Sequence, residues 1–188
     1  MANTATNVTA GKPKVGGAIY IAPLGTTLPE STSETLTGFA CLGYVSEDGV
    51  TNDNSPESDS VKAWGGDTVL TLQTDRPDSF GFTLLEVLNK DVLGAVYGES
   101  NVTEDGNGNI SVKVTSEQLP SKAWVIDMVV RDGRAKRIVI PNGTISNLST
   151  ITYADNSAVG YGVTVTDVPD EDGVYHYEYI SAETEISG

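Results

Sequence analysis

The sequence predicts a mainly β protein: a β-sandwich or small barrel of two packed sheets, with one short α-helix on its flank. Apolar and polar residues alternate with period 2, the pattern of strands with one buried face, in about ten short segments. Twenty glycines among 188 residues separate these segments with turn signals. Helical spacing is confined to one short stretch. Two packed β layers with a helix beside them satisfy this pattern.

The middle of the chain predicts a strand, a turn, a second strand and a helix. Residues 69–74 alternate, with Leu70 and Leu72 on one face, as in a half-buried strand. Residues 76–78, Arg-Pro-Asp, are expected to form the turn. The second strand covers residues 80–84. We expect the two strands to form a pair.

The helix follows directly. Val92, Leu93 and Val96 recur at helical spacing. Asn89 is a suitable N-cap, because its side-chain oxygen can accept a hydrogen bond from the first turn. Gly98 suits the left-handed residue that ends many helices. The sequence therefore predicts a helix from 89 to 97.

A resemblance rests on the order of residues in this stretch, GGD…LTLQTD…F.FTLLE.LN..VLGAVYG. It is similar to the central segment of the major tail-tube proteins of long-tailed (siphovirus-type) bacteriophages, with a looser echo over residues 136–173. The resemblance implies two packed β-sheets, a flanking helix, a long loop that reaches the neighbouring ring and a mobile N-terminal arm. It also implies that six copies close a ring and that rings stack into a hollow tube for DNA passage during ejection.

Other expectations come with the resemblance. The partners would be further copies of the chain, a tape-measure protein, a tail terminator and distal tail proteins, and no sheath is implied. The chain would be located in the virion, as a minimal tube subunit. Without an apolar run long enough to span a bilayer or a secretory signal, we expect no membrane partner and synthesis and assembly in the host cytoplasm.

We expect residues 1–15 to form a flexible arm and residues 16–188 to form one domain. The formal net charge of −15 argues against nucleic-acid binding, since phosphate contacts require Lys and Arg. Two alternative explanations fit this charge: it keeps the protein soluble, or it forms a lumen wall that repels DNA. One candidate for the inward face is the mixed series Val125, Asp127, Val129 and Arg131.

The segment 45–67 is long and acidic. It is predicted to be either a disordered loop or an extended hairpin that leaves the body and requires a neighbour. Val50, Val61 and Trp64 have the spacing for the hairpin. Its six acids are Glu47, Asp48, Asp53, Glu57, Asp59 and Asp67.

Residues 122–140 predict a hairpin around an Asp132-Gly133 type I′ turn. A two-residue loop would place Arg131 opposite Arg134, where like charges repel. The tip of this hairpin is either solvated, or its positive charge is neutralised by acids of segment 45–67 from another copy. The second contact would build rings or filaments. The candidate interface residues are Glu47, Asp48, Asp53, Glu57, Asp59, Trp64, Arg131, Arg134, Lys136 and Arg137.

Residues 145–153, 159–166 and 174–180 predict the remaining strands. In the last of these, Tyr175, Tyr177 and Tyr179 alternate with His176 and Glu178, a pattern that either packs a sheet or forms a binding platform. The second function is therefore a monomeric β-sandwich binding module of carbohydrate-binding or adhesin type, using these tyrosines.

Metal and catalytic sites are not expected. Asp105, Asn107 and Asn109 match only the start of a calcium loop, and the acidic turn 167–173 is interpreted as a solvated loop. The only histidine, His176, lies beside tyrosines, and no G-x-S-x-G elbow, P-loop or dinucleotide fingerprint is present. Paired carboxylates remain arithmetically possible. We expect a non-enzyme without cofactor or metal.

Overall fold

The computed structural model describes residues 3–182, which form one bent antiparallel β-sheet, two small hairpins and a single α-helix, confirming the mainly β fold class. The helix is α1 (Lys90–Tyr97), and short 3₁₀ turns cover Ala5–Asn7, Glu99–Asn101 and Arg131–Gly133. The strands are β1 (Lys12–Pro13), β2 (Ile19–Pro23), β3 (Ala40–Cys41), β4 (Val45–Asp53), β5 (Glu57–Lys62), β6 (Thr68–Asp75), β7 (Ser79–Leu84), β8 (Val102–Glu104), β9 (Ile110–Val112), β10 (Lys122–Val129), β11 (Ala135–Leu148), β12 (Tyr161–Asp167) and β13 (Tyr177–Ile180).

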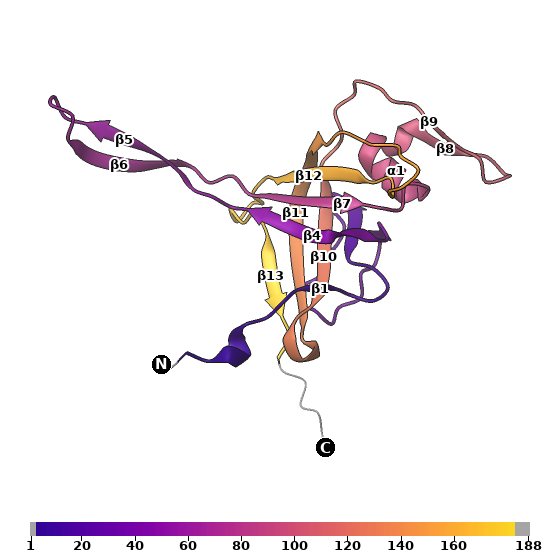
Figure 1. Cartoon of the computed structure of the whole chain (residues 1–188), viewed down its shortest axis with the longest axis horizontal. Coiled ribbons are helices and arrows are strands. Elements are labelled where there is room, and N and C mark those ends of the chain that lie inside the picture. Colours follow the sequence, from indigo (N-terminus) through magenta and orange to yellow (C-terminus); the bar gives the residue numbers. More distant parts are fainter. Residues whose placement is uncertain (1–2, 183–188) are drawn as a thin grey trace, which may run out of the picture.

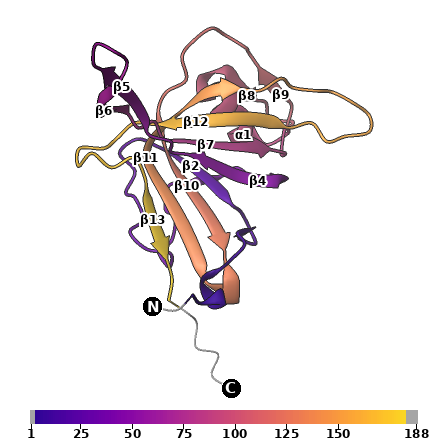
Figure 2. The same ribbon diagram turned by 60° about the vertical axis from the view of Figure 1, so that its left-hand side comes forward.

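Nine strands form the main sheet in the order β3-β2-β10-β11-β12-β7-β4, with β1 beside β10 and β13 beside β11. The long strand β11 divides the sheet into two layers. Its first half pairs with β10 and β13, and its second half pairs with β12. Gly143 lies at the change, opposite both Lys122 and Asp167, and register shifts flank it. In Figure 1, β10 and β13 run upright while β7 and β12 cross them, and Figure 2 shows the same two directions.

The core lies between these layers. Trp124 is 1% exposed and packs against Phe82, with 6.0 Å between the two ring centroids. Its indole Nε1 donates a 3.0 Å hydrogen bond to the Gly143 carbonyl, so a polar group in the core is satisfied. A Cβ at position 143 would lie 2.7 Å from Val165, because the two strands approach closely there.

The helix has the predicted ends. Asn89 Oδ1 accepts a 2.9 Å hydrogen bond from the Asp91 N–H, and Gly98 has a φ of 92°. Val92, Leu93 and Val96 are buried. The N-cap, the helix and its apolar face are therefore confirmed.

The predicted pairing of the two central strands is wrong. β6 pairs with β5, whereas β7 pairs with β4 and β12. Leu70 and Leu72 are about half exposed, at 49% and 50%. The alternation over residues 69–74 belongs to a strand of a projecting hairpin and not to a half-buried strand of the body.

The β10–β11 hairpin is present, but its register differs from the prediction by one residue. Val129 pairs with Ala135, so the loop has three residues, 131–133. The backbone of Val130, not Arg131, faces Arg134, and its N–H donates to the Arg134 carbonyl at 2.8 Å. Asp132 and Gly133 both have positive φ, as their residue types allow. Residues 145–148, expected to begin a separate strand, continue β11.

The described part of the N-terminal segment lies along the same hairpin. Lys12 pairs with Val129 in the sheet. Arg131 donates from its backbone N–H to Thr9 Oγ1 at 2.6 Å and from its guanidinium to the Ala5 carbonyl at 2.7 Å. These bonds connect residues 5–13 to the turn of β10 and β11.

Candidate functional site

The hairpin of β5 and β6 is the most prominent surface feature. It projects from one side of the body, as Figure 1 shows. Every residue of both strands is exposed. Two-stranded hairpins have little stability of their own in water, so a hairpin of this length is expected to be covered by a neighbour.

The two faces of this hairpin differ. The cross-strand pairs Val61–Leu70 and Asp59–Leu72 lie on one face. On the other face, Ser60 Oγ lies 3.5 Å from Thr71 Oγ1. The first face presents three large apolar side chains, Val61, Leu70 and Leu72, and we call it the apolar hairpin face. At the tip, Trp64 is fully exposed.

The acidic segment 45–67 is not a single loop. Its first part forms β4 at the edge of the main sheet, and its second part forms β5 and the hairpin tip. Glu47, Asp48 and Asp53 therefore lie on β4, whereas Glu57 and Asp59 lie on the hairpin. All five acids are exposed.

Three of the four predicted basic interface residues lie at the end of the β10–β11 hairpin. Each has a partner within the chain. The Arg131 guanidinium binds the Ala5 carbonyl, Arg134 Nε donates to the Ser181 carbonyl at 2.8 Å, and Lys136 lies 2.8 Å from Glu178. The acidic segment of the same chain does not supply these partners.

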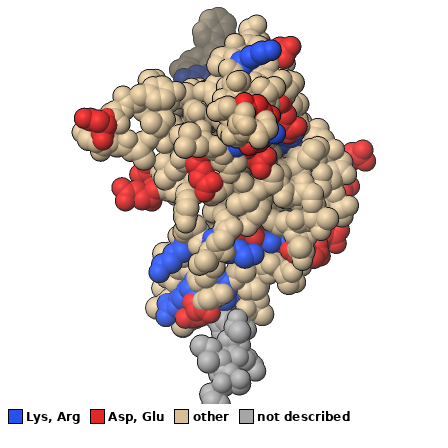
Figure 3. Space-filling view, turned by 90° about the vertical axis from the view of Figure 1, so that its right-hand side faces the viewer, with Lys and Arg blue, Asp and Glu red and all other residues tan. Residues whose placement is uncertain are grey.

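Positive side chains gather at this end of the molecule. Figure 3 shows blue side chains in the lower part of that face and red ones mainly above them. We call the group the basic end. Its members are Lys12 on β1, Lys14 just after β1, Arg131 and Arg134 between β10 and β11, and Lys136 at the start of β11. In Figure 1 the basic end and the projecting hairpin lie at different extremities of the chain.

Arg137, the fourth predicted basic residue, is placed differently from the expectation. It is 1% exposed and makes two hydrogen bonds to Asp127, of 2.6 and 2.8 Å. Its remaining donors reach the carbonyls of Ser31 and Glu34, in the loop that covers this face. Arg137 therefore belongs to the interior of the subunit, and its neutralising acid comes from the adjacent strand.

Asp127 lies in the face that was a candidate for the lumen. Asp127 is 3% exposed and Val125 is fully buried, so this part of the face does not line a channel in the subunit described. Burial acts to raise the pKa of Asp127, but hydrogen bonds from Arg137 and Lys14 outweigh it and hold the pKa below its usual range. The lumen-face prediction for Val125 and Asp127 is wrong, because both side chains are buried within the subunit.

The acidic turn 167–173 divides into two parts. Asp170 closes the turn, accepting hydrogen bonds from the N–H groups of Asp172 and Val174 and from the Tyr177 hydroxyl. Asp167, in contrast, continues the buried face of β12 into the core. It is 4% exposed, so it is not part of a solvated loop.

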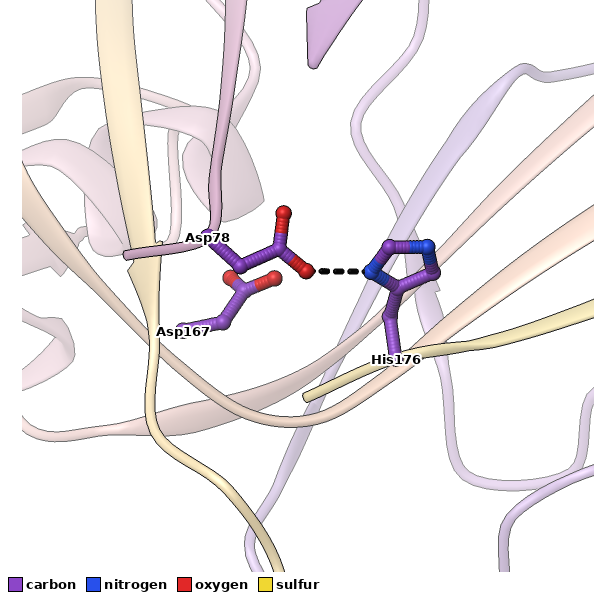
Figure 4. Close-up of side chains that lie close together, drawn as sticks. All are labelled: Asp78, Asp167 and His176. Atoms are coloured by element: carbon purple, nitrogen blue, oxygen red, sulfur yellow. Dashed lines mark hydrogen bonds and ion pairs between the residues drawn. The ribbon is translucent and has the colours of Figure 1, made fainter. Parts of the chain in front are cut away.

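Asp167 belongs to a cluster that sequence reasoning missed. Asp78 and His176 lie beside it, and His176 Nδ1 contacts Asp78 Oδ2 directly (Figure 4). The three residues come from the residue before β7, the end of β12 and the residue before β13. One sequence signal was available, because Asp167 occupies the position after Tyr161, Val163 and Val165 in the period-2 series.

The tyrosines of β13 show no separate recognition geometry. Tyr177 and Tyr179 stack with ring centroids 6.4 Å apart, and the Tyr177 hydroxyl binds Asp170. β13 itself is only four residues long and pairs with β11. These contacts are those of aromatic residues that pack a sheet edge.

A β-sandwich that carries a projecting hairpin with an uncovered apolar face is typical of a protein that assembles with other chains. The part of the chain that the structure describes contains no helix long and apolar enough to cross a membrane. The family described as phage tail tube protein matches residues 1–187, and the chain belongs to this family. It is therefore a structural, β-rich component of a phage virion.

Two further comparisons are less informative. The chain in "Cryo-EM structure of the anti-feeding prophage cap (AFP tube terminating cap)" aligns with 96% of this chain and 100% of its own length, at a TM-score of 0.44 and 10% sequence identity. No curated protein matches the chain.

Proposed function

We propose that the chain is the major subunit of a phage tail tube. Copies close into rings, six to a ring, and the rings stack into a hollow tube through which DNA passes during ejection. In this role the chain has no catalytic function and requires no cofactor. Its partners are further copies of itself along the tube and, at the ends and in the lumen, terminator, distal tail and tape-measure proteins.

The observation that carries the proposal is the apolar hairpin face. Val61, Leu70 and Leu72 are 48%, 49% and 50% exposed. Covering the exposed half of such side chains is worth roughly 1 kcal/mol each. A neighbour that covers this face therefore stabilises both the hairpin and the contact. Membership of the tail tube family favours another copy of the chain as that neighbour.

The position of the hairpin favours a contact between two different surfaces. It extends away from the body that carries it (Figure 1). The surface it meets on the next copy is thus part of a body and not a second hairpin. Contacts between unlike patches are heterologous, and they generate closed rings or open stacks.

The sheet edges offer a second set of contacts. β3 and β4 end the strand order, and each has one edge without a partner strand among the described residues. Exposed edges can pair with strands of another chain. We expect these edges to join neighbouring subunits within a ring, so that their sheets form a continuous barrel.

Charge contributes to both assembly and DNA passage. The exposed acids Glu47, Asp48, Asp53, Glu57 and Asp59, together with Trp64, are proposed to face the basic end of a neighbour, where Arg131, Arg134 and Lys136 lie. Arg137 is excluded from this set by its burial. The net charge of −15 also leaves acids for a lumen that repels phosphate.

Negative-stain electron microscopy of the purified protein at high concentration, with light scattering on the same sample, tests the proposal. Rings or hollow tubes of uniform width are expected. A protein that stays monomeric at every concentration and also fails to extend isolated tail tips from its phage contradicts a tube role. The same result would favour a monomeric binding module instead.

A further inference from the structure

Three ionisable side chains converge at the root of the projecting hairpin. Asp78, Asp167 and His176 each offer one ligand atom, and these atoms all lie within 4.8 Å of one another. Figure 4 shows the two carboxyl groups side by side, with the imidazole ring facing Asp78. Segments separated by as many as 98 positions in the chain meet here.

Asp167 lacks a partner in this cluster. Neither of its carboxyl oxygens has a hydrogen-bond partner among residues 3–182, although both are buried. Buried carboxyl oxygens without a partner are costly in a protein interior. A cation satisfies the oxygens directly.

We propose that Asp78, Asp167 and His176 form a binding site for one divalent transition-metal ion, with Zn²⁺ the ion that the ligands suit best. Zn²⁺ accepts Asp oxygens and His nitrogens as well as Cys sulfur among its ligands, whereas all-oxygen sites suit Mg²⁺ and Ca²⁺. Two carboxylates balance the charge of the ion. A site without net charge is the form that a protein interior tolerates.

The surroundings orient the ligands. Asn52 Nδ2 donates a 2.7 Å hydrogen bond to Asp78 Oδ1, which leaves Oδ2 directed toward His176. The rings of Phe80 and His176 pack nearly perpendicular to each other, with 5.2 Å between ring centroids. A hydrogen bond such as that from Asn52 orients a ligating carboxylate. The ion would replace the direct contact between Asp78 Oδ2 and His176 Nδ1. The His176 side chain is 17% exposed, which gives the ion a route from solvent.

The position of the site gives the ion a structural role. Asn52 and Asp78 lie where β4 leaves the sheet for the hairpin and where β7 returns from it. An ion bound to Asp78 joins this root to the end of β12 and to the start of β13. It thereby stabilises the folded subunit and fixes the hairpin base, whether or not the subunit forms tubes.

The test uses the full chain, stripped of metal with a chelator, and a zinc titration in a buffer that sets the free ion concentration. We expect one Zn²⁺ per chain by calorimetry and elemental analysis. At a free concentration a hundred times the dissociation constant, the thermal midpoint should rise by about 5 to 10 °C. The same titrations with Mg²⁺ and Ca²⁺ should give weaker binding.

Two variants identify the ligands. Asp167→Asn keeps the shape of the side chain, and His176→Gln changes the exposed edge of the site. We expect each to weaken zinc binding by at least tenfold and, at the same free zinc concentration, to reduce the rise in the thermal midpoint by about half or more. Asp172→Asn is the matched control, because Asp172 is an exposed acid in the neighbouring turn, and it should bind zinc like the wild type.

Two results would contradict the proposed zinc site or its assigned ion. Zinc binding that is absent, or equal in the wild type and in whichever of the two ligand variants folds by circular dichroism, contradicts the site. Tighter binding of Ca²⁺ than of Zn²⁺ contradicts the assigned class of ion. All of these measurements are made on the unassembled subunit, so they stand or fall separately from tube formation.

Discussion

Arg137 and Asp127 face each other across β10 and β11 and are joined by two buried hydrogen bonds of 2.6 and 2.8 Å. Their side chains are 2% and 4% exposed. Breaking a buried ion pair leaves a charge without its partner, which costs about 3 to 5 kcal/mol. Lys14, 3.1 Å from Asp127, reduces this cost but does not replace the bidentate contact.

Replacing Arg137 should therefore destabilise the subunit. We expect Arg137→Leu to lower the free energy of unfolding by about 3 kcal/mol in urea titrations. Arg134→Leu, at the partly buried hairpin end, removes a single hydrogen bond to a carbonyl and should lower it by less than about 1.5 kcal/mol. Equal losses in the two variants would show that Arg137 is not held by a buried pair.

The same pair predicts a pH dependence. The pKa of Asp127 is lower in the folded state, so its contribution is fully present above the unfolded value of about 3.9 and is lost as the pH falls through the folded value. Unfolding midpoints should fall more steeply below about pH 4 in the wild type than in Asp127→Asn. Glu117→Gln, which changes an exposed acid, should retain the wild-type profile. Identical profiles for all three proteins would contradict the assignment.

The residues that could be predicted from the sequence are those with local causes. Asn89 and Gly98 define the helix because capping chemistry acts within one turn. Leu70 and Leu72 were misplaced, because a projecting amphipathic hairpin and a half-buried strand have the same period.

Long-range partners account for the rest. The carbonyls that cover Arg137 lie 103 and 106 positions away in the sequence, so nothing near Arg137 indicated its burial. His176 was interpreted as a mid-strand residue, whereas its contact is with Asp78, 98 positions earlier. Only Asp167 carried a local signal, a carboxyl group in a series of apolar positions.

The apolar hairpin face predicts which substitutions stop assembly. Leu70→Asp removes one of the three apolar side chains of that face and adds a second carboxylate beside Asp59, and it should abolish rings and tubes because covering an unpaired charge is costly. Thr71→Asp adds the same charge to the opposite face and should assemble. Both should unfold within about 0.5 kcal/mol of the wild type, since both positions are exposed. Sedimentation and electron microscopy separate the outcomes, and equal assembly of the two variants would refute a role for this face.

Charge reversal tests the contact between the acids and the basic end. The double variant Arg131→Glu, Arg134→Glu should weaken assembly by removing two positive charges from the proposed surface. Adding Glu57→Lys and Asp59→Lys to that variant should partly restore it. The wild-type contact should also weaken as salt is raised, because exposed charges are screened. If the two added lysines do not restore assembly, the acids contribute to solubility and not to this contact.

A subunit without the hairpin provides the sharpest test of a contact between unlike surfaces. Asp53 pairs with Ser79 at the hairpin root, so a short Gly-Ser linker can replace residues 55–76 while the body is left intact. Such a subunit lacks the donated hairpin but keeps the surface that receives one. Because a heterologous contact needs both, the shortened subunit should join growing assemblies and stop them. It should therefore reduce tube length even in mixtures where it is much less abundant than the wild type. Light scattering of mixtures at fixed wild-type concentration measures this effect. If the shortened subunit merely dilutes the wild type, the hairpin does not carry the contact between rings.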